Sequence, residues 1–188
     1  MSVLDQSARH AGATAARTDF KGRSIGFYHP NSKGTGSALR LEPRLNRDDA
    51  DRYNCFFIEM ARQKTPARRE GGKMVAATFD WDQKITVKLS FMDVAELLTV
   101  AEGRAARVGG ERNGLYHATG KGNTLISFQR NPEQGTFFLG LSAKRGAEEA
   151  NKVCITLSET EVTGLRCLFQ TGLFFVTFSS LMRGEGRG

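Results

Sequence analysis

Two copies of one stretch decide the fold of this chain: Gly26-Phe27-Tyr28-His29-Pro30-Asn31-Ser32-Lys33-Gly34 and Gly114-Leu115-Tyr116-His117-Ala118-Thr119-Gly120-Lys121-Gly122. Tyr, His, Lys and Gly stand at the same relative positions in both, and nearly half of the chain separates them. A repeat of this kind predicts that one structural unit is built twice. In each copy an aromatic run passes into a glycine-containing turn, which is typical of a strand that enters a hairpin.

The segments after each copy alternate between apolar and polar residues, as strands with one buried face do. In the first half the sequence predicts strands at 25–29, 38–42, 53–63 and 74–89, the last interrupted near Asp82-Gln83, and a loop at 64–73. Apolar residues recur at matching positions of the two halves: Leu39, Leu41, Phe56, Ile58, Met60, Ile85, Val87 and Leu89 in the first, and Ile126, Phe128, Phe137, Leu139, Leu141, Val153, Ile155 and Leu157 in the second.

Each half is expected to end in a helix that begins with a capping box. Ser90 is followed three residues later by Asp93, and Ser158 by Glu161, and apolar residues at helical spacing come next. The second helix is expected to continue past Gly172, because the apolar run that follows needs to be buried.

The predicted fold class is therefore α+β, with a unit of four antiparallel strands and one helix used twice. A single domain is expected at 23–182, with repeats at 23–103 and 113–182. Residues 1–22 are expected to form a flexible basic arm and residues 183–188 a flexible tail.

The composition favours an anionic partner. The 188 residues carry a formal charge of +7, and nucleic acid is the commonest partner of such a protein, although a solvated basic surface would have the same charge. Cys55, Cys154 and Cys167 are expected to be reduced, mostly buried thiols. No stretch has the length of a membrane span, so we expect a cytoplasmic or nucleoid-associated protein, with organelle targeting left open.

The sequence offers no catalytic constellation. It has no Gly-x-Ser-x-Gly elbow, and the turn at 119–122 departs from the phosphate-binding loop at its second Gly and its Ser or Thr. Carboxylates and histidines are not spaced as metal ligands. His29 and His117 are interpreted as hydrogen-bonding residues that close the two hairpins. We therefore predict no enzyme activity, no cofactor and no metal.

The faces turned away from the helices are expected to carry aromatic side chains. If the apolar positions point inward, then Tyr28, Phe57, Tyr116 and Phe138 point outward. Aromatic rings on an exposed sheet suit unpaired bases, which stack on them for about 1–3 kcal/mol per base. The alternative is that these rings are covered by the second sheet, by the N-terminal arm or by another subunit.

Cations surround these aromatic positions in the predicted sheets, turns and loops. Phosphate contacts are predicted for Lys33, Arg40, Arg62, Lys64, Arg68, Arg69, Lys88, Lys121, Lys144 and Arg145. The alternative for the basic loop from Arg62 to Lys73 is a solvated linker.

The repeated unit resembles the Whirly-type single-stranded DNA-binding family, whose fold is shared by kinetoplastid guide-RNA-binding proteins and positive cofactor four. The resemblance covers Ser24 to about Met182 and rests on the strand order and on the Lys-Gly turn. The family signature Lys-Gly-Lys-Ala-Ala-Leu is matched only by Lys33-Gly34 and Ala38-Leu39, and by Lys121-Gly122 in the second copy.

This resemblance implies binding of single-stranded DNA or RNA with little sequence preference, in replication, recombination, repair or transcription. It also implies a homo-oligomer, a dimer or tetramer, that assembles through the helices. Two alternatives are an RNA-binding protein of the same fold and a non-catalytic assembly scaffold that docks an acidic partner. A duplex-binding factor is disfavoured, since both helices are expected to belong to the core.

Overall fold

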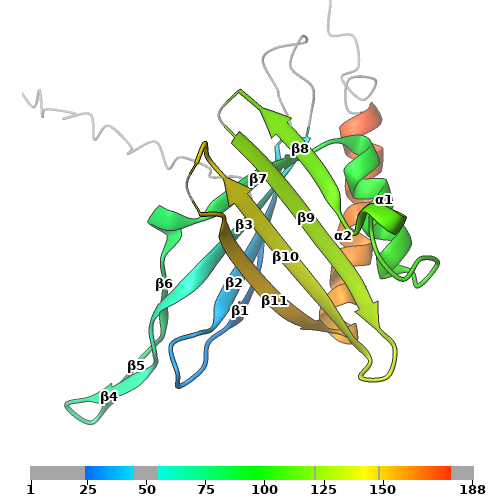
Figure 1. Ribbon diagram of the computed structural model, residues 1–188. Helices are drawn as coiled ribbons and strands as arrows, with labels where there is room; N and C mark the ends of the chain where they lie inside the picture. The colour runs from blue at the N-terminus through cyan, green and yellow to red at the C-terminus, as the bar shows by residue number, and fades with distance from the viewer. Residues whose placement is uncertain (1–23, 45–54, 121, 148, 179–188) are drawn as a thin grey trace, which may run out of the picture.

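The computed structural model describes residues 24–44, 55–120, 122–147 and 149–178, which form two large antiparallel sheets, a separate two-stranded hairpin and two α-helices (Figure 1). In sheet 1, β1 (Ile25–His29) pairs with β2 (Ser37–Arg44), and β2 pairs with β3 (Cys55–Thr65). Both β6 (Thr78–Phe79) and β7 (Ile85–Leu89) pair with β3.

Sheet 2 repeats this order without an insertion. It consists of β8 (Leu115–Thr119), β9 (Gly122–Asn131), β10 (Thr136–Lys144) and β11 (Asn151–Ser158), in the spatial order β11-β10-β9-β8. The short 3-10 helices η1 (Trp81–Gln83) and η2 (Gly110–Arg112) lie outside the strands. The predicted α+β class is confirmed. The second repeat has four strands followed by a helix, whereas the first has seven, because β4, β5 and β6 lie between β3 and β7.

The segment between β3 and β7 differs from its prediction. The predicted loop at 64–73 is wrong, because β4 (Arg68–Glu70) and β5 (Lys73–Val75) pair as a hairpin that extends away from the sheets (Figure 1). Its turn is Gly71-Gly72, and both residues have positive φ angles, of 56° and 80°. The predicted extended segment at 74–89 is accordingly divided among β5, β6, η1 and β7.

The helices begin where the capping boxes predict. α1 (Phe91–Ala101) begins after Ser90, whose hydroxyl accepts a hydrogen bond from the Asp93 backbone N–H at 3.2 Å. The equivalent bond from Glu161 to Ser158, 3.3 Å long, starts α2 (Glu159–Phe178). α2 continues through Gly172, as predicted.

Gly172 is needed at its place in α2 for a steric reason. A Cβ atom there would collide with the ring of Phe56, which is 1% exposed in β3. The second repeat's helix therefore packs closely on the first repeat's sheet. The inward residues of both sheets and the apolar faces of both helices form one continuous core, which unites the repeats in a single packing unit.

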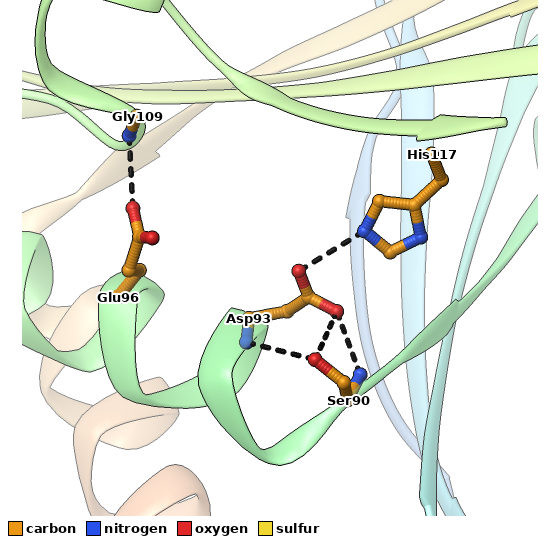
Figure 2. A network of polar contacts seen from close by, with 5 residues as sticks. All are labelled: Ser90, Asp93, Glu96, Gly109 and His117. Atoms are coloured by element: carbon orange, nitrogen blue, oxygen red, sulfur yellow. Dashed lines mark hydrogen bonds and ion pairs between the residues drawn. The ribbon is translucent and has the colours of Figure 1, made fainter.

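The repeated histidines link the two repeats. His29 Nε2 lies 2.6 Å from Glu161 Oε1, and His117 Nε2 lies 3.0 Å from Asp93 Oδ1 (the second contact is drawn in Figure 2). The interpretation of these residues as hairpin-closing groups was wrong. His29 ends β1 and His117 lies in the middle of β8, and each imidazole meets the capping carboxylate of the other repeat's helix. The two contacts are equivalent, so they are a property of the repeated scaffold.

The thiols also differ in part from the expectation. Cys55 is buried, whereas Cys154 and Cys167 are exposed, and all three are free. Cys154 points outward because it alternates with the buried Val153 and Ile155 in β11, the period that a half-buried strand requires.

Candidate nucleic-acid interface

No described residue covers the outer face of sheet 2, which we call the bare face and which is partly aromatic. Tyr116 is 62% exposed and pairs across the strands with Leu125, which is 37% exposed. Phe138 shares this face on β10, and its ring leans over Gly140, where a Cβ would lie 3.3 Å from the ring atom Cε1. Ser142 continues the row of Tyr116 and Leu125. This face has the flat apolar surface that stacking on bases requires.

The outer face of sheet 1 carries a covering of its own. Tyr28, 48% exposed, makes edge contacts with Phe79 at 5.6 Å and with Trp81 at 6.3 Å between ring centroids. The guanidinium of Arg40 lies 4.1 Å from the centre of the Trp81 ring. We call Tyr28, Phe79, Trp81 and Arg40 the sheet 1 cluster. The outward aromatic residue Tyr28 is therefore partly covered, as one of the alternatives above expected. The covering residues come from β6 and η1.

Beside this cluster, a buried carboxylate lies between two cations and leaves a net positive charge. Glu59, on the outward-facing side of β3, is only 8% exposed. Its carboxylate lies 2.7 Å from Lys84 Nζ and 3.9 Å from a nitrogen of Arg40, and it accepts a 3.3 Å hydrogen bond from the Thr86 hydroxyl. These contacts fix Arg40 beneath Trp81.

Sheet 1 meets the free edge of β11 in what we call the closed junction. The Ser37 hydroxyl donates a 2.6 Å hydrogen bond to the carbonyl of Cys154. Arg62 donates to the carbonyl of Lys152 from Nε at 3.2 Å and from Nη2 at 2.7 Å. Arg62 was predicted to contact phosphate, but its guanidinium is occupied by this bond between the repeats.

Sheet 2 meets the edge of β7 in what we call the open junction. Thr124 and Ala143 pair with each other there as Ser37 and Arg62 do in sheet 1. Ala143 is too short to reach β7, and an open groove of about 560 Å³ lies between the two elements. Its charged lining comprises Asp82, Lys84, Lys88, Lys144, Arg145 and Glu149, beside the imidazole of His117.

Three of the predicted cations therefore come together at one place, namely Lys88, Lys144 and Arg145. Lys144 pairs with Asn123, two residues beyond the row that holds Tyr116, and is therefore on the same face of sheet 2. The groove and the bare aromatic face are thus adjacent.

The other predicted residues lie elsewhere. Lys33 is exposed in the β1–β2 turn, and Lys121 lies outside the described residues. Lys64 precedes the projecting hairpin, which carries Arg69 and Arg68, the latter 3.3 Å from Glu70. Arg44 lies over Phe57, 4.9 Å from the ring centre. Their roles in binding stay predictions.

Sequence reasoning missed Phe79, Trp81, Lys84 and Leu125. The first two lie in a segment that was interpreted as one long strand, and their contact with Tyr28 joins residues far apart in the chain. A signal was available, since Trp81 is the one tryptophan of the sequence and precedes the break at Asp82-Gln83.

Two groups have shifted pKa values. Burial raises the pKa of the Cys55 thiol and outweighs the nearby Lys88 and Arg44, which keeps the thiol protonated at neutral pH. Burial also acts to raise the pKa of Glu161. Hydrogen bonds from Ser158 and His29 outweigh that effect, and the pKa lies below the ordinary carboxyl value.

The described residues define an α+β protein in which one chain builds a pseudo-dimer of a five-stranded and a four-stranded unit, with an exposed aromatic sheet face beside a cationic groove. The chain belongs to the Whirly transcription factor family, whose model matches residues 72–168. No curated protein sequence matches the chain.

Solved structures have the same fold. WHY3 from Arabidopsis thaliana is 19% identical with a TM-score of 0.63, over 85% of this chain and 91% of that one. The trypanosome MRP1/MRP2 structure is 21% identical with a TM-score of 0.58, over 85% and 88%. The plant transcriptional regulator PBF-2 is 15% identical with a TM-score of 0.62, over 88% and 96%. Among the described residues of this chain, no helix is long and apolar enough to cross a membrane.

Proposed function

We propose that the protein binds single-stranded nucleic acid with little sequence preference. The observation that carries this proposal is the adjacency of the bare face of sheet 2 to the basic groove at the open junction. Tyr116, Leu125 and Phe138 provide apolar surface for bases, and Lys144 and Arg145 lie beside them for phosphates. Membership of the Whirly transcription factor family supports a role with nucleic acid.

Unpaired strands fit this surface better than a duplex does. In a duplex the bases are stacked and paired, and they cannot reach rings on an open sheet. Stacking tolerates every base because each has a π-face, so low sequence preference follows. Such a protein would act where strands are exposed, in replication, recombination, repair or transcription.

We also propose that the protein self-associates through its helices. The first turn of α1 supports this assembly, because Phe91 and Met92 are 49% and 63% exposed there. Helix contacts between copies would leave both sheets turned outward.

A fluorescence-anisotropy titration with labelled single-stranded DNA, single-stranded RNA and duplex of one length, at one salt concentration, tests the function. We expect tight, salt-dependent binding to an unpaired strand and much weaker binding to duplex. Equal affinity for duplex and single strands would contradict the proposal, and the RNA arm distinguishes the two kinds of strand.

A second measurement distinguishes nucleic-acid binding from the assembly-scaffold alternative. Tyr116→Ala with Phe138→Ala removes both rings from the face of sheet 2, and we expect weaker oligonucleotide binding. The scaffold predicts unchanged oligonucleotide binding and a loss of association in sedimentation velocity.

A further inference from the structure

The sheet 1 cluster is an aromatic surface that the proposed strand path on sheet 2 does not use. Tyr28, Phe79 and Trp81 come from β1, β6 and η1, and their rings meet edge to face. Trp81 and Phe79 are half-buried, and Tyr28 is 48% exposed. The rings are therefore neither core residues nor isolated surface residues.

Trp81 is held in a fixed orientation. Arg40 lies against its ring at 4.1 Å, and Arg40 is in turn close to Glu59, which also binds Lys84. A cation on a ring face restrains the ring without covering its edge. An aromatic group that is already ordered loses little conformational entropy when a ligand stacks on it.

The cluster is continuous with the groove of the open junction. Trp81 directly precedes Asp82, and the residues from Asp82 to Lys88 line that groove. Trp81 itself is outside the groove lining, and a strand whose phosphates follow β7 would come close to it at the Asp82 end. At the other side of the groove, Lys144 is next to the row of Tyr116.

We propose that the sheet 1 cluster is a second base-stacking subsite, in which Trp81 and Tyr28 receive a nucleobase of the strand held in the groove. The proposal rests on the proposed function and adds to it. It places stacking groups on both repeats, joined by the cations Lys84, Lys88, Lys144 and Arg145. The subsite takes a base of any identity, since its groups are ring faces and edges.

Because the chain has a single tryptophan, its intrinsic fluorescence reports on this subsite alone. The full chain is titrated with oligodeoxythymidylate while tryptophan emission and the anisotropy of a labelled tracer are followed. We expect emission to fall with the same midpoint as the rise in anisotropy. Polyglutamate is titrated in parallel and is expected to leave emission unchanged.

Substitutions at Trp81 test the subsite in a second, independent way. Trp81→Ala is expected to weaken oligonucleotide binding about 5- to 150-fold, the range for loss of one stacked base. Trp81→Phe keeps a ring and is expected to retain most of the affinity. Met74→Ala is the control, since Met74 is an exposed apolar side chain that lies on β5 outside the groove lining.

The outcomes separate the two proposals. No rise in anisotropy would refute the proposed function itself. Binding with unchanged tryptophan emission and native affinity in Trp81→Ala would overturn the subsite and leave the function intact. Tighter binding by Trp81→Ala would mean that Trp81 blocks the sheet, and quenching by polyglutamate would assign the cluster to an acidic peptide. Either result overturns the proposal. If Trp81→Ala does not fold, the tryptophan emission of the unsubstituted protein still tests the proposal.

Discussion

The two junctions between the repeats involve matching sequence positions, but one junction is closed by hydrogen bonds and the other is an open groove. At the closed junction Ser37 and Arg62 donate hydrogen bonds to the carbonyls of Cys154 and Lys152 on β11. At the open junction Thr124 and Ala143 occupy the same paired positions, and a groove separates them from β7. The side chain of Arg62 is long enough to reach β11, whereas Ala143 has only a methyl group and does not reach β7. This difference in length explains why one junction is closed and the other open. The repeat therefore specifies the scaffold, and side-chain size at a strand edge decides where a ligand can enter.

The two helices begin in the same way but differ in length. Both begin with a capping box whose carboxylate meets a histidine of the other repeat. α1 ends at Ala101, followed by Gly103 with φ of 75°, whereas α2 continues to Phe178 and passes over Phe56 at Gly172. The extra turns of α2 attach the second repeat to sheet 1.

The largest expected effect tests that attachment. Gly172→Ala places a methyl group against the buried Phe56 ring, and we expect a loss of about 2 kcal/mol in the free energy of unfolding, although alanine favours a helix by about 1 kcal/mol. Urea denaturation measures it. Gly164→Ala is the matched control on the same helix, because a Cβ there meets nothing within 4 Å, and it should stabilise the protein. Equal effects at both positions would contradict the close approach of α2 to sheet 1.

The next effect tests the open junction as the phosphate site. Replacing Lys144 and Arg145 by Gln is expected to weaken single-strand binding about tenfold, or ~1.4 kcal/mol. The slope of log K against log salt should fall by about 1.4, since each phosphate contact contributes about 0.7 for a single strand. Affinity is measured by anisotropy over a range of salt concentrations.

Lys64→Gln tests the competing prediction that Lys64 contacts phosphate, because Lys64 occupies in β3 the place that Arg145 has after β10. It lies on the side of the closed junction, outside the groove lining, and we expect its affinity to change less than twofold. A loss as large as that of the double variant would move the phosphate path away from the groove.

A smaller effect tests whether Arg62 joins the two repeats or contacts phosphate. If Arg62 serves the closed junction, Arg62→Ala should lower the free energy of unfolding by about 1 kcal/mol, the usual contribution of a hydrogen bond, and leave oligonucleotide affinity unchanged. Urea denaturation and anisotropy measure the two quantities. Reduced affinity at unchanged stability would return Arg62 to the nucleic-acid interface, as its sequence context had predicted.

The sequence predicted those parts of the molecule that local patterns determine. The capping residues Ser90 and Ser158 were correct because a cap depends on positions three residues apart. The helix through Gly172 was correctly predicted, but burial of the apolar run is not the reason, since Leu173 is half-buried and Phe174 is 48% exposed. The outward aromatics Tyr28 and Tyr116 were correct because strand residues alternate.

Contacts between distant segments were not predictable in the same way. The bond from Arg62 to β11 and the meeting of Tyr28 with Trp81 depend on how the two sheets and the β6–η1 segment lie in space. The histidines show this most clearly, since their partners belong to the other repeat and a local reading assigned them to their own hairpins.

The smallest effect concerns the pH dependence of the His29–Glu161 contact. The pKa of Glu161 is lower in the folded protein than its ordinary value of 4.5, so the ionised carboxylate stabilises the fold above that pH. This stabilisation is lost as the pH falls through the folded-state pKa, where the unfolded chain is already protonated. Glu161→Gln should therefore be less stable than the native protein at neutral pH, and the difference should shrink below about pH 4.5. Urea midpoints measured from neutral to acidic pH test this, and a difference that is the same at every pH would show that shape, and not charge, matters at Glu161.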